Sequence, residues 1–186
     1  MQLTRRTLTA AALALAAPIG PVMASSAHAA SRDKLAAKGI SALRELEAGD
    51  ARARFIAKHA KAVLVFPSIL KAGLVFGAQT GNGVLLRAGK PVGYYNITGG
   101  SWGLQIGAQD FAYALFFMTD SALDYLKKSD GFSAGTGPSI TVINKGAATE
   151  ANTTTLSQDV YAFPFNGKGL MADLTLQGTK ITRIHQ

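Results

Sequence analysis

The chain has 186 residues, of which 48% are hydrophobic, and a formal net charge of +8. Its length suits one domain with a core of its own, and the absence of cysteine excludes disulfides and a lipoprotein anchor. The basic balance favours anionic partners such as nucleic acid, acidic lipid headgroups or acidic protein surfaces, without choosing among them.

The first 29 residues have the composition of a signal peptide. Arg5 and Arg6 precede an apolar stretch over residues 8–17, and residues 27–29 read Ala-His-Ala, a small-residue cleavage site. The apolar run is about half the roughly 20 residues that a membrane span needs. We therefore predict cleavage after Ala29, export to the periplasm or the medium, and a single mature domain of residues 30–186 with a net charge of +6.

The arginine pair of this segment resembles the twin-arginine type of bacterial export signal, whose substrates fold before export. An ordinary Sec signal with adjacent arginines is the alternative. Export by either route argues against nucleic acid as the partner of the basic chain.

Helical periodicity predicts two helices at the start of the mature chain. Apolar residues recur at helical spacing from Arg32 to Glu47, and Asp50 is the expected N-cap of a second helix that reaches Val63. The second helix carries a basic stripe, whose simplest interpretation is a solvated face. The stripe consists of Arg54, Lys58 and Lys61.

After Val63, short runs of β-branched and aromatic residues alternate with Pro, Gly and Asn, which predicts strands joined by turns. Asn82 and Gly83 predict a hairpin turn, and residues 87–91 the next one. Thr119 or Asp120 is expected to cap a short helix through Lys128. We therefore predict an α+β fold in which N-terminal amphipathic helices pack on a largely antiparallel, Gly-rich twisted sheet or partly closed barrel, with one short helix inserted.

One motif suggests catalysis. Residues 99–103 read GGSWG, which matches the G-x-S-x-G nucleophile elbow of α/β-hydrolases with Ser101 as nucleophile. Asp159 or Asp173, followed by His185, completes the chain order of a triad. The elbow requires a helix directly after the serine, whereas the residues that follow alternate as a strand. We predict that the protein is not an enzyme and keep a serine hydrolase as a remote alternative.

The sequence offers no motif for a metal or a cofactor. The two histidines of the mature chain, His59 and His185, lie far apart and no cysteine accompanies them, so we predict no metal site. Gly81 and Gly83 begin a dinucleotide-type motif, but Leu86 stands in place of its third glycine, so we predict no cofactor.

Residues 102–109 alternate apolar residues with glycine and glutamine, which predicts one strand with two different faces. The face made of Gly103, Gln105, Gly107 and Gln109 has little bulk, so a backbone, a second sheet or an acyl chain can approach it closely. Packing against a neighbouring element of the same domain is the alternative.

The same stretch carries a family resemblance. Residues 99–109, GGSWGLQIGAQ, resemble the glycine and glutamine motif of the SYLF domain family, also known as the yeast actin-binding and lipid-binding domain. Residues 60–86 and 166–178 resemble the family's N-terminal and C-terminal blocks, although Met171, Asp173 and Gln177 depart from the second block. The motif residues that we interpret as structural or ligand-facing are Gly99, Gly100, Gly103, Gln105, Gly107 and Gln109.

The resemblance implies lipid binding, because eukaryotic members bind phosphoinositides and in some cases actin, and exported bacterial members are regarded as lipid-binding proteins. We therefore predict association with anionic phospholipid or a membrane surface through the N-terminal helices. A protein-interaction module of the cell envelope, docking a partner or assembling with itself, is the alternative. The candidate lipid-binding residues are Arg52, Arg54, Lys58, Lys61 and Lys71.

Overall fold

The computed structural model describes residues 22–73, 76–102, 107–128, 132–133, 137–143, 156–167 and 178–185. Most of the expected signal segment lies outside the described residues, as do Gly103 and Gln105 of the motif. In chain order the elements are α1 (Val22–Gly49), α2 (Ala51–His59), β1 (Ala62–Gly73), β2 (Phe76–Arg87), β3 (Lys90–Trp102), β4 (Gly107–Phe117), α3 (Asp120–Lys128), β5 (Phe132–Ser133), β6 (Ile140–Val142), β7 (Val160–Phe165) and β8 (Thr179–Arg183).

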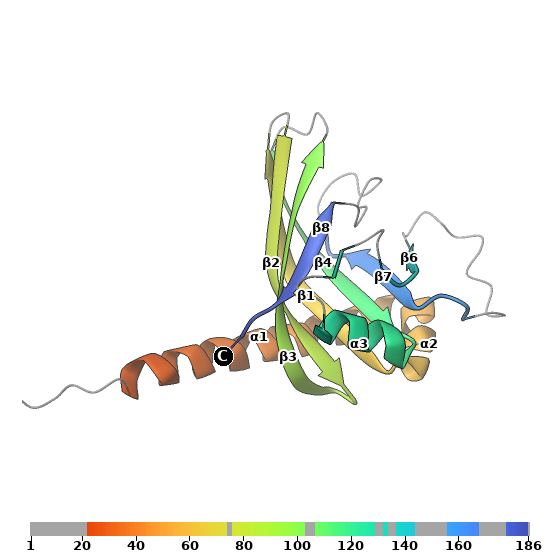
Figure 1. Cartoon of the computed structure of the whole chain (residues 1–186), viewed down its shortest axis with the longest axis horizontal. Helices are drawn as coiled ribbons and strands as arrows, with labels where there is room; N and C mark the ends of the chain where they lie inside the picture. Colours follow the sequence, from red (N-terminus) through yellow and green to blue (C-terminus); the bar gives the residue numbers. More distant parts are fainter. Residues whose placement is uncertain are drawn as a thin grey trace, which may run out of the picture.

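The eight strands within the described residues form one strongly curled sheet in the order β5-β8-β3-β2-β1-β4-β7-β6 (Figure 1). Neighbouring strands are antiparallel, except that β6 runs parallel to β7. The four long strands β1 to β4 make up its centre. The predicted α+β fold with a largely antiparallel sheet and one short inserted helix is therefore confirmed.

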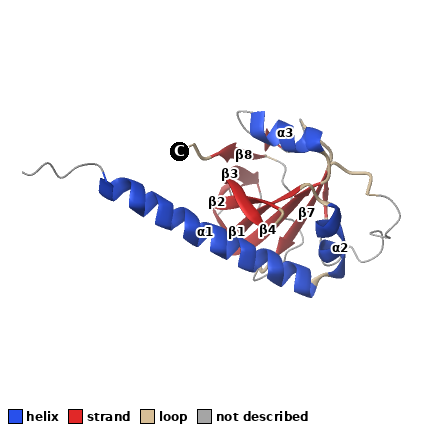
Figure 2. Cartoon of the chain, turned by 90° about the horizontal axis from the view of Figure 1, so that it is seen from below, coloured by secondary structure: helices blue, strands red, loops and turns tan. Residues whose placement is uncertain are grey.

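The sheet has a hydrophobic core on each face, with α1 and α2 over one face and α3 over the other (Figure 2). Side chains alternate between the two cores along each strand, as the period of a strand requires. On β1, Val63 and Val65 pack toward α1 and α2, whereas Leu64 and Phe66 pack toward α3. The sheet therefore separates the side of the molecule covered by α1 and α2 from the side covered by α3.

Helix α1 is longer than predicted, because it begins at Val22 instead of Arg32 and runs through the expected cleavage site. The Ala-rich composition of the added turns accounts for this, since alanine has the highest helix propensity. Residues 28–31 are exposed, and Ala36 is the first buried residue within the part of α1 whose burial is described, residues 28–49. Cleavage after Ala29 stays a prediction.

The hairpin turn predicted at Asn82 and Gly83 is wrong, because β2 runs straight through both residues. A Cβ atom at Gly83 would lie 2.6 Å from the Phe66 ring and 2.8 Å from the carbonyl oxygen of Val65. The glycine is needed for a close approach between β1 and β2, not for a turn. The turn predicted over residues 87–91 is confirmed, with Ala88 at φ 49° and Gly89 at φ 74°.

The single strand predicted over residues 102–109 is also wrong. Strand β3 ends at Trp102, which pairs with Phe76, and β4 begins at Gly107, which pairs with Gly73 on the opposite side of the β1–β2 pair. Alternation within a short segment cannot reveal that its two ends belong to strands with different partners, because strand pairing depends on residues far away in the sequence.

Candidate functional site

The predicted N-cap of the second helix is confirmed and involves one of the candidate basic residues. Asp50 accepts hydrogen bonds from the backbone N–H groups of Arg52 (2.8 Å) and Ala53 (3.4 Å). The Arg52 guanidinium binds the same carboxylate through Nε (3.1 Å) and Nη2 (2.7 Å). Arg52 therefore has a structural partner at the start of α2. Helix α2 ends at His59 and β1 begins at Ala62, so the second helix is shorter than the predicted one, which reached Val63.

Replacing Asp50 by alanine is expected to lower the free energy of unfolding by about 1 kcal/mol at pH 7 through loss of the cap. The Arg52 side chain, aided by the cap hydrogen bonds, holds the pKa of Asp50 below its ordinary value of 3.8. Because the folded-state pKa is lowered, this stabilisation is complete above the ordinary pKa and is lost as the pH falls through the folded-state value.

Urea unfolding at a series of pH values checks this prediction. The difference between the native protein and Asp50→Ala should shrink as the pH is lowered from about 5 to about 3. Asp33→Ala, which removes an exposed carboxylate of α1, serves as the control and should change stability little. A difference at Asp50 that stays constant down to pH 3 would contradict the assignment.

Arg54 joins the two N-terminal helices. Its guanidinium donates to the carbonyl oxygens of Glu47 (2.8 Å) and Ala48 (3.1 Å), which lie in the last turn of α1. Burial raises the pKa of Glu47, and the nearby Arg54 and Arg44 oppose that rise. Arg54 thus satisfies carbonyl groups at the end of a helix, although its side chain stays at the surface.

The other three candidate residues lie in different surroundings. Lys58 is exposed on α2, and Lys61 forms an ion pair with Asp120 of α3 (3.5 Å). Lys71 lies near the far end of β1, about 30 Å from Lys61 at the usual rise of a strand. The structure brings Arg52, Arg54 and Lys58 together on α2 and leaves Lys71 apart from them.

Two further lysines on α1 were missed in the sequence. Lys34 and Lys38 are exposed, four residues apart, and neither they nor Lys58 form an ion pair with a described residue. We call Lys34, Lys38 and Lys58 the helix lysines. The sequence signal that could have revealed Lys34 and Lys38 is their i, i+4 spacing on the side of α1 opposite its apolar residues. Residues 30–61 hold eight Lys and Arg against four Asp and Glu, so most of the mature charge lies here.

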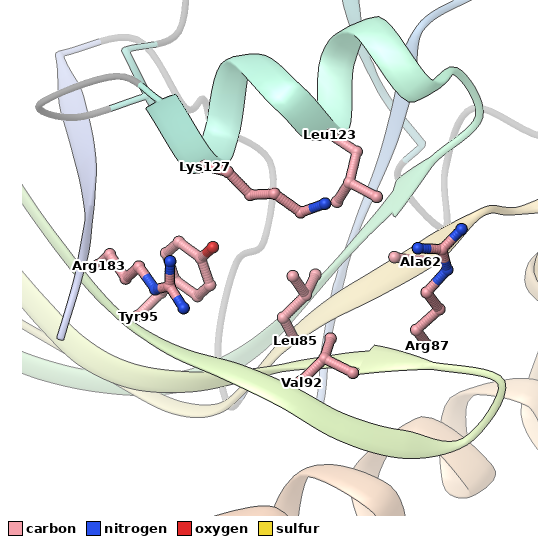
Figure 3. Close-up of a pocket in the computed structure, with 8 residues that line it drawn as sticks. All are labelled: Ala62, Leu85, Arg87, Val92, Tyr95, Leu123, Lys127 and Arg183. Carbon is pink, nitrogen blue, oxygen red and sulfur yellow. The ribbon is translucent and has the colours of Figure 1, made fainter. Parts of the chain in front are cut away.

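A cavity of about 210 Å³ lies on the other face of the sheet, beneath α3 (Figure 3). Three exposed basic side chains from separate elements line it: Arg87 at the end of β2, Lys127 in the last turn of α3 and Arg183 at the end of β8. Figure 3 shows Lys127 reaching across the cavity from the helix, with Arg183 on one side and Arg87 on the other. No acidic residue is among the described residues that line it.

The inner wall of this cavity is apolar. Leu85, Leu123 and Ala62 are nearly fully buried, and Tyr95 is 1% exposed. Burial raises the pKa of Tyr95, although the charge of Arg183 opposes the rise. The phenol therefore remains a neutral hydrogen-bonding group beside the cations. Sequence reasoning missed this site, because its cationic residues are separated by up to 96 positions in the chain.

The described glycines of the motif have different roles. A Cβ at Gly99 would lie 2.9 Å from Thr179 and 3.1 Å from the carbonyl oxygen of Gly178, so this glycine permits tight packing of β3 beside β8. Gly100 is exposed, and a Cβ there would meet nothing within 4 Å. Gly107 and Gln109 lie in β4, where Gln109 pairs with Lys71. Gly99 therefore has a packing role between β3 and β8.

Ser101 lies within β3, where it pairs with Gly77 of β2. A nucleophile elbow instead places its serine at a sharp turn between a strand and a helix. The described part of the chain holds no group of three or more His, Asp or Glu side chains placed to bind a metal ion. Within the same part, no helix has both the length and the apolar character that a membrane crossing requires.

The chain folds as a small α+β module with exposed basic side chains on both sides of one sheet. Residues 98–186 match the model of the Ysc84 family, which is described as Las17-binding protein actin regulator. This match confirms the resemblance to the SYLF family over that part of the chain. No curated protein matches the chain.

Proposed function

We propose that this is an exported lipid-binding protein that associates with anionic phospholipid at a membrane surface. The observation that carries the proposal is the set of helix lysines, which are exposed on α1 and α2 and have no ion-pair partner among the described residues. The family that the chain matches is one of lipid- or actin-binding-like modules, which supports a membrane or a protein as the partner. The export signal expected at residues 1–29 favours an envelope membrane over actin.

The physical argument is electrostatic with a small apolar contribution. A lysine close to an anionic bilayer contributes about 1 kcal/mol to binding, and this contribution decreases as salt screens the charge. Phe55 is 36% exposed on α2, and its ring lies in a tilted contact with that of His59 at a centroid distance of 4.7 Å, so it can insert an aromatic ring between headgroups. Arg52 and Arg54 add positive potential but remain tied to Asp50 and to the end of α1.

Co-sedimentation of residues 30–186 with vesicles tests the proposal. We expect pelleting with vesicles of phosphatidylcholine and phosphatidylglycerol, little pelleting with phosphatidylcholine alone, and weakening as salt rises. Loss of two contacts of about 1 kcal/mol each means that Lys38→Glu with Lys58→Glu should reduce binding at least 30-fold. Lys128→Glu with Lys180→Glu, which reverses two exposed charges on α3 and β8, is the matched control and should leave binding nearly unchanged.

Two results would count against the proposal. One is an absence of pelleting with either vesicle at low salt, which would favour a protein-interaction module of the cell envelope. The other is an equal loss of binding in the two double variants, which would show that total charge matters and the helix lysines do not.

A further inference from the structure

We infer that the cavity beneath α3 is a second binding site, which takes the phosphate group of a phosphate ester whose carbon stem is short and apolar. The site lies on the face of the sheet opposite α1 and α2, so it is separate from the membrane contact proposed above. It therefore does not depend on that contact.

The charge of the cavity points to an anion. Arg87, Lys127 and Arg183 line the same small cavity, with Lys127 between the two arginines, and an anion bound there would reduce the repulsion among these like charges. The described residues offer little negative charge to balance these cations. Asp124 lies 3.9 Å from Lys127, but exposed i, i+3 ion pairs of this kind contribute little to stability. Neither arginine forms an ion pair with a described residue.

The composition of the donors favours phosphate over carboxylate. Two guanidinium groups and one ammonium group offer many N–H donors from three directions, and phosphate presents more acceptor oxygens than a carboxylate does. Arginine also matches phosphate in a bidentate geometry. The neutral hydroxyl of Tyr95, beside Arg183, supplies one more hydrogen bond.

The size and the inner wall restrict the rest of the ligand. A volume of about 210 Å³ is below the usual range of pockets that enclose a whole drug-sized ligand. Leu85 and Leu123 present hydrocarbon behind the cations, so a few methylene groups attached to the phosphate gain from burial there. A free phosphate ester and the headgroup end of a phospholipid both have this chemistry.

Isothermal titration calorimetry of residues 30–186 with n-butyl phosphate, inorganic phosphate and butyrate tests the inference. We expect n-butyl phosphate to bind at least tenfold more tightly than either inorganic phosphate, which lacks the stem, or butyrate, which lacks the third oxygen. Arg87→Glu with Arg183→Glu should weaken n-butyl phosphate at least 100-fold. Lys180→Glu is the matched control, because Lys180 is exposed on β8 but does not line the cavity.

Several outcomes decide the matter. The inference is overturned if n-butyl phosphate does not bind at millimolar concentration, or if Lys180→Glu weakens binding as much as the double variant does. Equal unfolding temperatures of the variants and the native protein would show that the fold is intact. Arg183→Gln gives a milder test, with an expected loss of about tenfold, should the double charge reversal unfold the chain.

Vesicles containing phosphatidic acid identify the source of the phosphate. If Arg87→Glu with Arg183→Glu lowers pelleting with these vesicles, the ligand is a lipid headgroup; if pelleting is unchanged while n-butyl phosphate binding is lost, it is a free ester. Both results support the site. Vesicle binding that depends on Lys38 and Lys58 without any n-butyl phosphate binding would refute this site and leave the proposed membrane contact intact.

Discussion

Replacing Gly83 by alanine is expected to lower the free energy of unfolding by about 2 kcal/mol, although alanine would ordinarily stabilise a strand relative to glycine. The added Cβ would lie 2.6 Å from the Phe66 ring and 2.8 Å from the carbonyl oxygen of Val65. Phe66 is fully buried and the carbonyl belongs to a central strand, so neither can move without disturbing the core. For a domain of this size the unfolding temperature should fall by about 4–8 °C.

Gly100→Ala is the matched control, because it adds the same methyl group to a glycine of neighbouring strand β3. A Cβ at Gly100 meets no atom within 4 Å, so the substitution should be neutral or slightly stabilising. Thermal and urea unfolding of both variants separate the two cases. Equal stability of Gly83→Ala and the native protein would contradict the close approach of β1 and β2.

Phe116→Ala should have the largest effect on stability, a loss of about 4 kcal/mol and a fall of about 8–16 °C in unfolding temperature. Phe116 is fully buried in the core beneath α1 and α2, where its ring meets that of Phe163 edge-on at a centroid distance of 5.3 Å. Truncation removes that contact and leaves a cavity between the sheet and the helices.

The matched control for this truncation is Leu70→Ala on β1. Leu70 is 50% exposed, so the loss of its side chain should cost well under 1 kcal/mol. Urea unfolding with a common m-value measures both variants. If Phe116→Ala were no more destabilised than Leu70→Ala, the core between the sheet and the N-terminal helices would not be packed as described.

The features that the sequence determined by itself are those that depend on neighbours along the chain. Asp50 at the start of α2 and Thr119 before α3 are recognisable because a cap binds N–H groups two or three residues away, as Thr119 does with Ala122 at 3.3 Å. The turn over residues 87–91 and the class of the sheet follow from local turn residues and strand periodicity. The family resemblance similarly rests on contiguous motifs, of which residues 98–186 are matched.

Other features were decided by tertiary structure, because they depend on which distant segments become neighbours. Gly83 looks like a turn residue until Phe66 packs against it, and residues 102–109 look like one strand until Trp102 and Gly107 are seen to pair with different partners. The cavity beneath α3 is the clearest case. Arg87, Lys127 and Arg183 have no common pattern in the sequence, and only the folding of three elements around Leu85 brings their charges together.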